Sequence, residues 1–392
     1  MLNRNFPNAM NGYFDHNATT PLSEPARDAW LAAQSGHWHN PSGLYREAGA
    51  AQQRLEESRE ELAEILGCEA RRIVFNSGAT EGCNAVMARA AREAAADAPV
   101  FISAIEHPAV RESARKEFGR ERVVELPVDS RGVVDLEVAR GMIADSAPAL
   151  VSVMAANNEI GVLQPWRELA EICRENGVRF HCDAAQWIGK MPADGFERCD
   201  WVSFSGHKFG GPKGAGVLVV PDDVRDPLAL LAGGAQESGH RGGTENFPAV
   251  AAMLAALRES GPVDATGRDA FEAGLEKTIP GTRIIGADAQ RLPNTSMVLM
   301  AVHGNLKWLT RLSERGFAVS TGSACSAGHG NPSHVMAAMG LSPDEMGRVL
   351  RFSGGPETTP GDWNALATAL VEIHTALQDR RRSVTKLDLS NL

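Results

Sequence analysis

Lys208 lies at the centre of the stretch that is best suited to covalent chemistry. The apolar run Trp201–Phe204 predicts a strand that ends in Ser205-Gly206-His207-Lys208, and the glycine-rich run Gly210–Gly214 follows it. A lysine held at a strand tip, partly removed from water and next to groups that bind a phosphate, suits a Schiff-base nitrogen. Taken alone, the stretch also fits a surface lysine in a glycine-rich turn, so the other motifs decide between the two.

Two further strand ends carry polar residues. Ser77-Gly78-Ala79-Thr80-Glu81 separates a predicted strand from a helix, where glycine permits close approach and free N–H groups attract an anion. Thr80 adds a hydroxyl there, or it only caps the helix. Asp183 ends another apolar strand and can hold a cation such as a protonated ring nitrogen, or it caps the next segment.

Three more segments carry polar candidates. His107 follows a strand and can stack on a flat ring, although a structural hydrogen bond is the alternative. The segment 156–161, which includes Asn158, follows another strand and also carries polar side chains. Thr244 lies in the glycine-rich loop 240–246 beside Arg241.

Cys325 and Arg351 complete the candidate set. Cys325 is flanked by Ser323, Ala324, Ser326 and Ala327 rather than by bulky apolar residues, which favours a reactive thiol over a structural cysteine. Arg351 is a candidate for bidentate binding of a substrate carboxylate, with an ordinary ion pair as the alternative.

The elements that position these residues follow an alternating pattern. Apolar runs separated by helical stretches predict a mostly parallel α/β sheet with helices on both faces, and ligands at the carboxyl ends of the strands. The seven predicted strands are Arg72–Asn76, Val100–Ile105, Val123–Leu126, Leu150–Met154, Val178–Cys182, Trp201–Phe204 and Ala215–Val220.

The pattern changes near residue 250, where strands and helices become mixed. We predict a large α/β domain over 15–250 and a smaller α+β domain formed by 1–14 and 251–392. The elements expected in the smaller domain are strands at Thr282–Ile285, Ser296–Val302 and Phe317–Ser320 and helices at Leu306–Arg315 and Trp363–Arg381.

Composition excludes several classes of function. The formal net charge of −10 argues against a general nucleic-acid or anionic-membrane binder, because such surfaces are usually basic. The N-terminus lacks a signal-peptide pattern, and no apolar run is long enough to span a membrane. The six cysteines show no CxxC spacing, so neither a disulfide framework nor a metal site is expected, and the expected location is the cytoplasm.

Taken in order along the chain, these motifs resemble the class V aminotransferase-fold enzymes that use pyridoxal 5'-phosphate. Within that family they resemble the cysteine desulfurases of the NifS and IscS type. The resemblance runs from Phe14–Pro21 to Arg351-Phe352-Ser353, and its most specific parts are Ser205–Lys208, Gly211–Gly214 and Gly322–Cys325. It implies a fold-type I architecture.

The resemblance also implies a role for each candidate. Lys208 would form the Schiff base, Asp183 would pair with the pyridinium nitrogen and His107 would stack on the ring. Gln186 would hydrogen-bond the ring hydroxyl oxygen, and Arg351 would bind the carboxylate of cysteine. The residues implied to hold the phosphate or line the pocket are Ala79, Thr80, Asn158, Ser205 and His207.

The implied reaction converts L-cysteine to L-alanine and leaves the sulfur on Cys325 as a persulfide. His107 would carry protons, and Thr244 would reach the phosphate of a neighbouring subunit, which implies a homodimer. The implied partner is a sulfur acceptor or an iron–sulfur scaffold protein. Ser238 and His240 stand where the family commonly has arginine. Selenocysteine lyase, another class V activity, and an inactive partner-binding homologue remain the alternatives.

Overall fold

The larger part of the molecule is built around a seven-stranded sheet. The computed structural model describes residues 12–224, 226–228, 231–322 and 333–389. The strands lie in the order β1-β7-β6-β5-β4-β2-β3; β7 is antiparallel to both neighbours, and the other neighbouring pairs are parallel. The bounds are β1 Ile73–Asn76, β2 Val100–Ser103, β3 Val123–Leu126, β4 Leu150–Ser152, β5 Phe180–Asp183, β6 Trp201–Ser205 and β7 Gly216–Val219.

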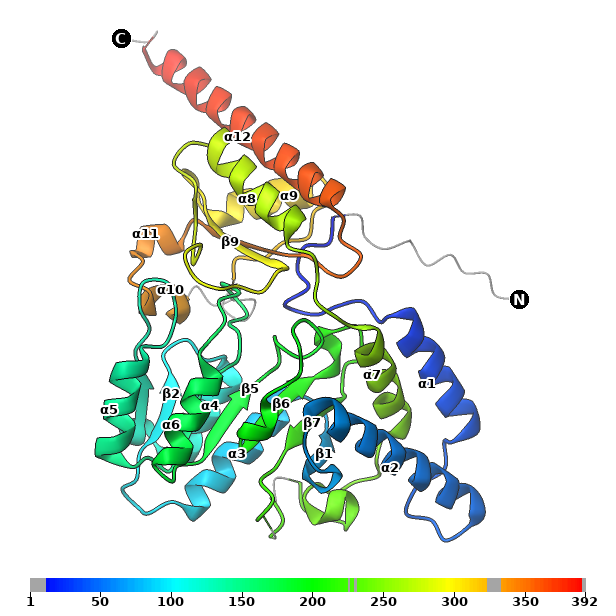
Figure 1. The fold of residues 1–392 in the computed structure, drawn as a ribbon. Helices are drawn as coiled ribbons and strands as arrows, with labels where there is room; N and C mark the ends of the chain where they lie inside the picture. The colour runs from blue at the N-terminus through cyan, green and yellow to red at the C-terminus, as the bar shows by residue number, and fades with distance from the viewer. Residues whose placement is uncertain (1–11, 225, 229–230, 323–332, 390–392) are drawn as a thin grey trace. The chain divides into compact units, whose positions relative to one another are not determined.

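All seven strands lie within two residues of their predicted ends, and the predicted mostly parallel α/β fold is confirmed. Every residue of β2, β4, β5, β6 and β7 is buried, because helices cover the sheet (Figure 1). The helices that surround this sheet are α1 Glu24–Gly36, α2 Arg46–Leu66, α3 Ala79–Glu93, α4 Pro108–Phe118, α5 Leu136–Ser146, α6 Trp166–Glu175 and α7 Phe247–Glu259.

Contacts between residues divide the chain into two compact units. The larger comprises Thr19–Asn158 and Val162–Pro262, and it contains the seven-stranded sheet. The smaller comprises the described part of Met1–Ala18, Glu159–Gly161 and the described part of Val263–Leu392. The short piece Glu159–Gly161 belongs to the smaller unit although it is surrounded in sequence by the larger one.

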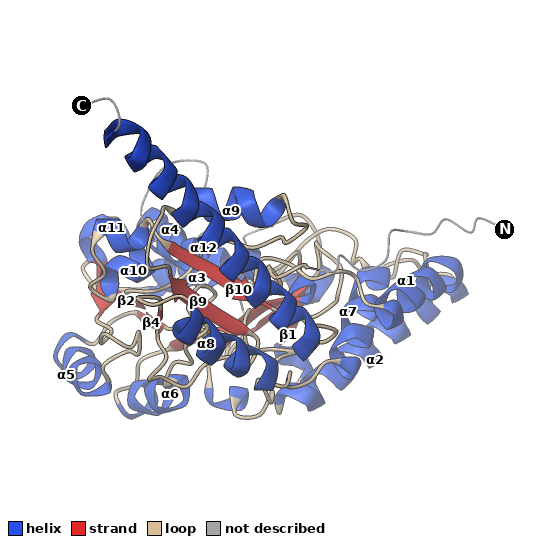
Figure 2. Ribbon diagram, turned by 90° about the horizontal axis from the view of Figure 1, so that it is seen from above, coloured by secondary structure: helices blue, strands red, loops and turns tan. Residues whose placement is uncertain are grey.

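The smaller unit is built on an antiparallel sheet with the order β10-β9-β8. Helices α8 and α12 pack together, and α8 also packs against β9 (Figure 2). The bounds are β8 Arg283–Ile284, β9 Thr295–Leu299, β10 Val349–Ser353, α8 Thr266–Thr278, α9 Asn305–Ser313, α10 His334–Ala338, α11 Pro343–Met346 and α12 Pro360–Leu389. Across the described ranges, no helix has the length and apolar character that a membrane crossing requires.

One predicted strand of this unit is wrong. Residues 317–320 form no strand and make only two single bridges, from Ala318 to Tyr13 and from Ser320 to Arg351. Gly316 and Gly322, both at positive φ, bend the chain on either side of this run. An apolar run of strand-forming residues therefore pairs here one residue at a time instead of joining a ladder.

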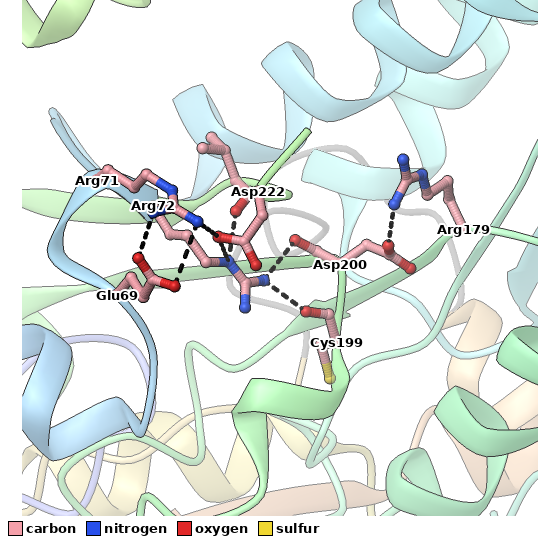
Figure 3. Close-up of polar contacts among 8 residues, drawn as sticks. Glu69, Arg71, Arg72, Arg179, Cys199, Asp200 and Asp222 are labelled. Carbon is pink, nitrogen blue, oxygen red and sulfur yellow. Dashed lines mark hydrogen bonds and ion pairs between the residues drawn. The ribbon is translucent and has the colours of Figure 1, made fainter. Parts of the chain in front are cut away.

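Arg72 holds together the strands at the end of the large sheet where β1 and β6 begin, which is opposite the strand ends that carry the polar motifs. The side chain is buried and donates from Nε to the Val220 carbonyl at 2.7 Å and from Nη2 to the Cys199 carbonyl at 2.8 Å (Figure 3). These bonds join the start of β1 to the end of β7 and the start of β6. The carboxyl ends of β1 and β6 consequently share the other edge.

Candidate active site

The carboxyl ends of five strands bring polar side chains to one edge of the large sheet. Asp183 and Ser205 are the last residues of β5 and β6, and Ser77-Gly78 follows β1. His107 follows β2, and Asn158 ends the segment that follows β4. This is the edge at which parallel α/β sheets bind ligands.

The end of β6 is hydrogen-bonded to the start of α3. The backbone N–H of Ala79 donates to Ser205 Oγ at 2.7 Å. Gly78, the N-cap of α3, has φ +149° and brings no capping side chain; a Cβ there would lie 3.0 Å from Ser205 Oγ. The helix therefore begins with N–H groups beside two hydroxyls, those of Ser205 and the exposed Thr80, which is a favourable arrangement for a phosphate.

Asp183 and Lys208 form the charged part of the site. Asp183 is 5% exposed, and its Oδ1 accepts a hydrogen bond from the N–H of Ala185 at 2.9 Å. Burial raises the pKa of Asp183 to about 6, although the Ala185 bond and the nearby charge of Lys208 act in the opposite direction. Lys208 is half-buried in the turn that follows β6.

His207 is held by residues near the N-terminus. Its Nδ1 lies 3.1 Å from Thr19 Oγ1, and its carbonyl accepts from the N–H of Thr20 at 2.9 Å. Burial lowers the pKa of His207 to about 4, and the neighbouring Lys208 and Lys213 lower it further. At neutral pH this imidazole is uncharged and binds as a hydrogen-bonding group.

Gln186 lies in a tight turn that follows Asp183. Its Oε1 accepts a hydrogen bond from Nζ of Lys190 at 2.6 Å, and both residues are buried. The same turn contains Gly189 at φ +79°, where a Cβ would lie 2.3 Å from Cβ of Phe209. The turn therefore packs closely against the residue that follows Lys208.

His107 is the N-cap of α4, and its Nδ1 accepts from the N–H of Ala109 at 3.1 Å. Its neighbour Glu106 is fully buried and accepts from Ser103 Oγ at 2.6 Å and from the N–H of Met154 at 2.7 Å. Burial raises the pKa of Glu106 to about 8, and the charge of Asp183 contributes. Glu106 thereby ties the end of β2 to the end of β4 and fixes the backbone that carries His107.

A buried hydrogen-bonded row lies behind Asp183. His181, two residues earlier on β5, contacts Ser152 Oγ through Nδ1 at 2.8 Å and Ser203 Oγ through Nε2 at 3.0 Å. Burial lowers the pKa of His181 to about 3, so the ring is neutral. Hydroxyls can donate or accept, so the row satisfies both nitrogens of the His181 ring while the ring stays uncharged.

The remaining sequence candidates lie elsewhere. Thr244 is exposed in the loop before α7, and in the same loop Arg241 pairs with Glu81 at 3.1 Å. Ser238 adopts φ +56°, and His240 is buried. Cys325 lies outside the described residues.

Arg351 belongs to the smaller unit, at the middle of β10. It is 2% exposed; Nη2 contacts Asp15 Oδ1 at 2.5 Å and Nη1 donates to the Gly322 carbonyl at 3.0 Å. The guanidinium is therefore held in place by an ion pair, which was the alternative that the sequence left open, and it is also a group able to bind a carboxylate.

Sequence reasoning did not single out Thr19, Asp15 and Lys190, whose side chains contact side chains of the candidates. Thr19 and Asp15 both lie in the motif Phe14–Pro21, but their partners His207 and Arg351 are 188 and 336 residues away. Lys190 stands four residues after Gln186, a spacing that brings side chains together in a helical turn. That spacing was the only signal in the sequence that could have paired Lys190 with Gln186.

Comparison with known proteins places this sequence in a family. The model of the aminotransferase class-V family matches residues 12–366. The chain belongs to the aminotransferase class-V family. This family uses pyridoxal phosphate.

Relatives with this fold and similar sequence carry related names. The chain is 36% identical over 378 residues to a protein of Methanosarcina thermophila named cysteine desulfurase IscS. The matched region covers 94% of this chain and 93% of that protein. A solved structure named NifS-like protein has a TM-score of 0.82 at 30% identity, covering 93% of this chain and 99% of that one. Another, titled SspA in complex with cysteine, has a TM-score of 0.77 at 30% identity, covering 89% and 100%.

The residues at the strand ends fit the family's cofactor. Gly78 leaves space where a Cβ would meet Ser205, and Gly216 packs so closely that a Cβ there would lie 2.4 Å from the Gly78 Cα. This small-residue cradle sits at a helix N-terminus beside hydroxyl and imidazole groups, which suits a phosphate. Asp183 and Lys208 are a carboxylate and an amine, which are the groups that would be needed to hold such a ring.

Proposed function

We propose that this protein is a pyridoxal-phosphate-dependent L-cysteine desulfurase that converts L-cysteine to L-alanine and transfers the sulfur to Cys325. The observation that carries the proposal is the placement of Asp183, Ser205 and Lys208 at adjacent strand ends, with Ser205 bonded to the start of α3. When bound, the cofactor supplies an electron sink that stabilises negative charge at the α-carbon of the amino acid.

The protein's own groups then divide the work. Ala79, Thr80, Ser205 and neutral His207 bind the phosphate, and Asp183 holds the ring nitrogen in its protonated form. His107 covers the ring, while Asn158 and Gln186 line the pocket. Nζ of Lys208 anchors the cofactor and takes the α-proton of cysteine, and His107 carries protons in later steps.

Substrate binding and sulfur transfer fall to the two candidates outside the larger unit. Arg351 binds the substrate carboxylate; its contact with Asp15 keeps the guanidinium oriented before substrate arrives. The thiolate of Cys325 attacks the substrate sulfur, so that the Cβ–Sγ bond breaks and its electron pair leaves with the carbon. Protonation of that carbon completes alanine, and the sulfur remains on Cys325 as a persulfide.

A homodimer with shared sites is part of the proposal. Thr244 is exposed and reaches the phosphate of the partner subunit. Five large apolar side chains of the larger unit, all within residues 22–45, are exposed and are available for such an interface; they are Leu22, Leu31, Trp38, Leu44 and Tyr45. The persulfide is then passed to an acceptor or scaffold protein for iron–sulfur cluster or thio-cofactor synthesis, in the cytoplasm.

The deciding experiment is an assay of alanine and sulfide in the same reaction of purified protein with L-cysteine and a thiol reductant. A desulfurase forms both products in equal amounts. Production of pyruvate or transfer of the amino group would indicate another class V reaction, and preference for selenocysteine would indicate a lyase for that substrate. Cofactor binding without turnover of any of these substrates would support an inactive partner-binding homologue.

The shared site is tested by mixing two inactive variants, Lys208→Ala and Thr244→Ala. In a mixed dimer one site carries both defects and the other carries neither, so about half of the sites of each mixed dimer recover. Absence of recovery after demonstrated subunit exchange would contradict the shared site while leaving the desulfurase assignment intact.

A further inference from the structure

Lys190 is a buried lysine that donates a hydrogen bond to a side-chain amide. It is 5% exposed, and its Nζ lies 2.6 Å from Oε1 of Gln186, which is itself 4% exposed. Burying an ammonium group is costly, so a buried lysine requires a compensating interaction. Gln186 provides one, and the pair lies directly after Asp183 in the chain.

The chemistry of the pair fixes the orientation of the amide. An ammonium group carries only donors, so the oxygen of Gln186 must face it. The NH₂ group of Gln186 then points away from Lys190. An isolated glutamine can turn its amide over, but this one cannot do so without placing two donors against each other.

The turn that carries both residues is held on three sides. The N–H of Ala184 donates to the Ser203 carbonyl on β6 at 2.9 Å, and Trp187 Nε1 donates to the Pro192 carbonyl at 2.8 Å. Gly189 packs against Phe209, the residue after Lys208. The amide of Gln186 is therefore fixed relative to both Asp183 and Lys208, which is the condition for precise placement of a donor.

We propose that Lys190 is a positioning residue, which presents the NH₂ group of Gln186 as the donor to the ring hydroxyl oxygen of the bound cofactor. The inference rests on the proposed use of pyridoxal phosphate. The donor stabilises negative charge on that oxygen, and this makes the neighbouring Schiff-base proton easier to lose. Lys190 thereby lowers the pH at which the cofactor's visible absorption changes, without touching the cofactor.

The test is a pH titration of the visible spectrum of the cofactor-loaded protein, together with measurement of cofactor affinity by equilibrium dialysis. The variants are Lys190→Met, Gln186→Leu and the double variant. Each single variant is expected to raise the titration midpoint by about one pH unit and to weaken cofactor binding about tenfold, as expected for one hydrogen bond to a charged group.

The double variant distinguishes positioning from a separate effect. Because Lys190 acts through Gln186, the double variant should shift the midpoint no further than Gln186→Leu alone. Lys190→Gln, which keeps a neutral donor toward Oε1, should titrate closer to the original protein than Lys190→Met. Lys190→Gln can also take the place of Lys190→Met in the titration if the methionine variant folds poorly.

The outcomes separate this inference from the proposed function. Additive shifts, or an unchanged midpoint in Lys190→Met, overturn the positioning role while the original protein still binds cofactor. Failure of the original protein to bind pyridoxal phosphate at all overturns the proposed function itself. A loss of thermal stability in cofactor-free Lys190→Met with an unchanged midpoint would mean that the pair is structural only.

Discussion

Arg59 and Glu237 form a buried, bidentate ion pair at the open edge of the large sheet. Nη1 lies 2.7 Å from Oε2 and Nη2 lies 2.9 Å from Oε1, with the two side chains 10% and 2% exposed. The pair also satisfies the edge of β1, because Arg59 donates to the Ile73 carbonyl and the Phe75 N–H donates to Glu237. Glu237 adopts φ +48°, so the same pair shapes the loop that leads to Thr244.

Removing one partner of this pair should be more harmful than removing its charges together. Glu237→Gln is expected to lower the free energy of unfolding by about 1–3 kcal/mol, because it removes the buried counter-charge and leaves Arg59 only its ion pair with the more exposed Glu56. The double variant Arg59→Met, Glu237→Gln should recover part of that loss. Urea unfolding of the original protein, of the single variants Arg59→Met and Glu237→Gln, and of the double variant measures the coupling. Purely additive effects would mean that the two residues act independently.

Lys208 is predicted to carry the cofactor. Lys208→Ala should lose the yellow colour and the linkage that borohydride reduces, because no other amine replaces the nitrogen at that position. Lys213→Ala is the matched control, since Lys213 lies five residues later and is exposed. Retention of the reducible linkage in Lys208→Ala, with its loss in Lys213→Ala, would reverse the assignment.

The raised pKa of Asp183 predicts opposite effects of pH on cofactor affinity and on stability. Below about pH 6 this carboxyl is protonated and offers no charge to a protonated ring nitrogen, so affinity should rise between pH 5 and pH 7.5. Asp183→Asn should bind weakly and lose the Asp183-dependent part of this rise. Fluorescence titration with pyridoxal phosphate at several pH values measures both.

The stability of the cofactor-free protein should change in the other direction. Because the folded pKa of Asp183 exceeds the ordinary value of about 3.9, its stabilising contribution is complete below that value and is lost as pH rises through about 6. Asp183→Asn should therefore be more stable than the original protein at pH 7.5, by about 1–3 kcal/mol, and similar at pH 4. Equal stability differences at the two pH values would show that the carboxyl does not titrate in this range.

Gly189 is expected to tolerate no side chain. Alanine there must adopt φ +79° and would place its Cβ 2.3 Å from Cβ of Phe209. We expect Gly189→Ala to cost about 1–2 kcal/mol for the backbone and a further 1–3 kcal/mol for the overlap, and to displace the turn beside Lys208. Gly177→Ala is the control, because Gly177 has φ +66° and open space around it. Equal losses in denaturant unfolding would show that only the backbone conformation matters.

The positions of the strand ends could be predicted well, because each depends on the residues immediately before and after it. Asp183 and Ser205 end apolar runs, so the pattern of burial placed them at the ligand-binding edge of the sheet. The pairing of Arg351 with Asp15 could not be predicted, since it joins residues 336 positions apart and depends on how β10 meets the N-terminal segment. The strand predicted over 317–320 failed for a related reason: strand propensity does not reveal whether a continuous partner is present.

Cys325 is predicted to accept the sulfur, and the prediction separates cofactor chemistry from sulfur transfer. Cys325→Ser should bind pyridoxal phosphate and cysteine normally, because Lys208 and Asp183 are unchanged, yet form no protein persulfide and almost no alanine. Cys68→Ser is the control; Cys68 is partly exposed, whereas the other four cysteines in the described ranges are buried. Burial raises the pKa of the Cys68 thiol, which makes it a poor nucleophile at neutral pH. Trapping the persulfide with an alkylating reagent and mapping it by mass spectrometry gives the answer: modification at Cys68 or Cys83, or full turnover by Cys325→Ser, would remove Cys325 from the mechanism.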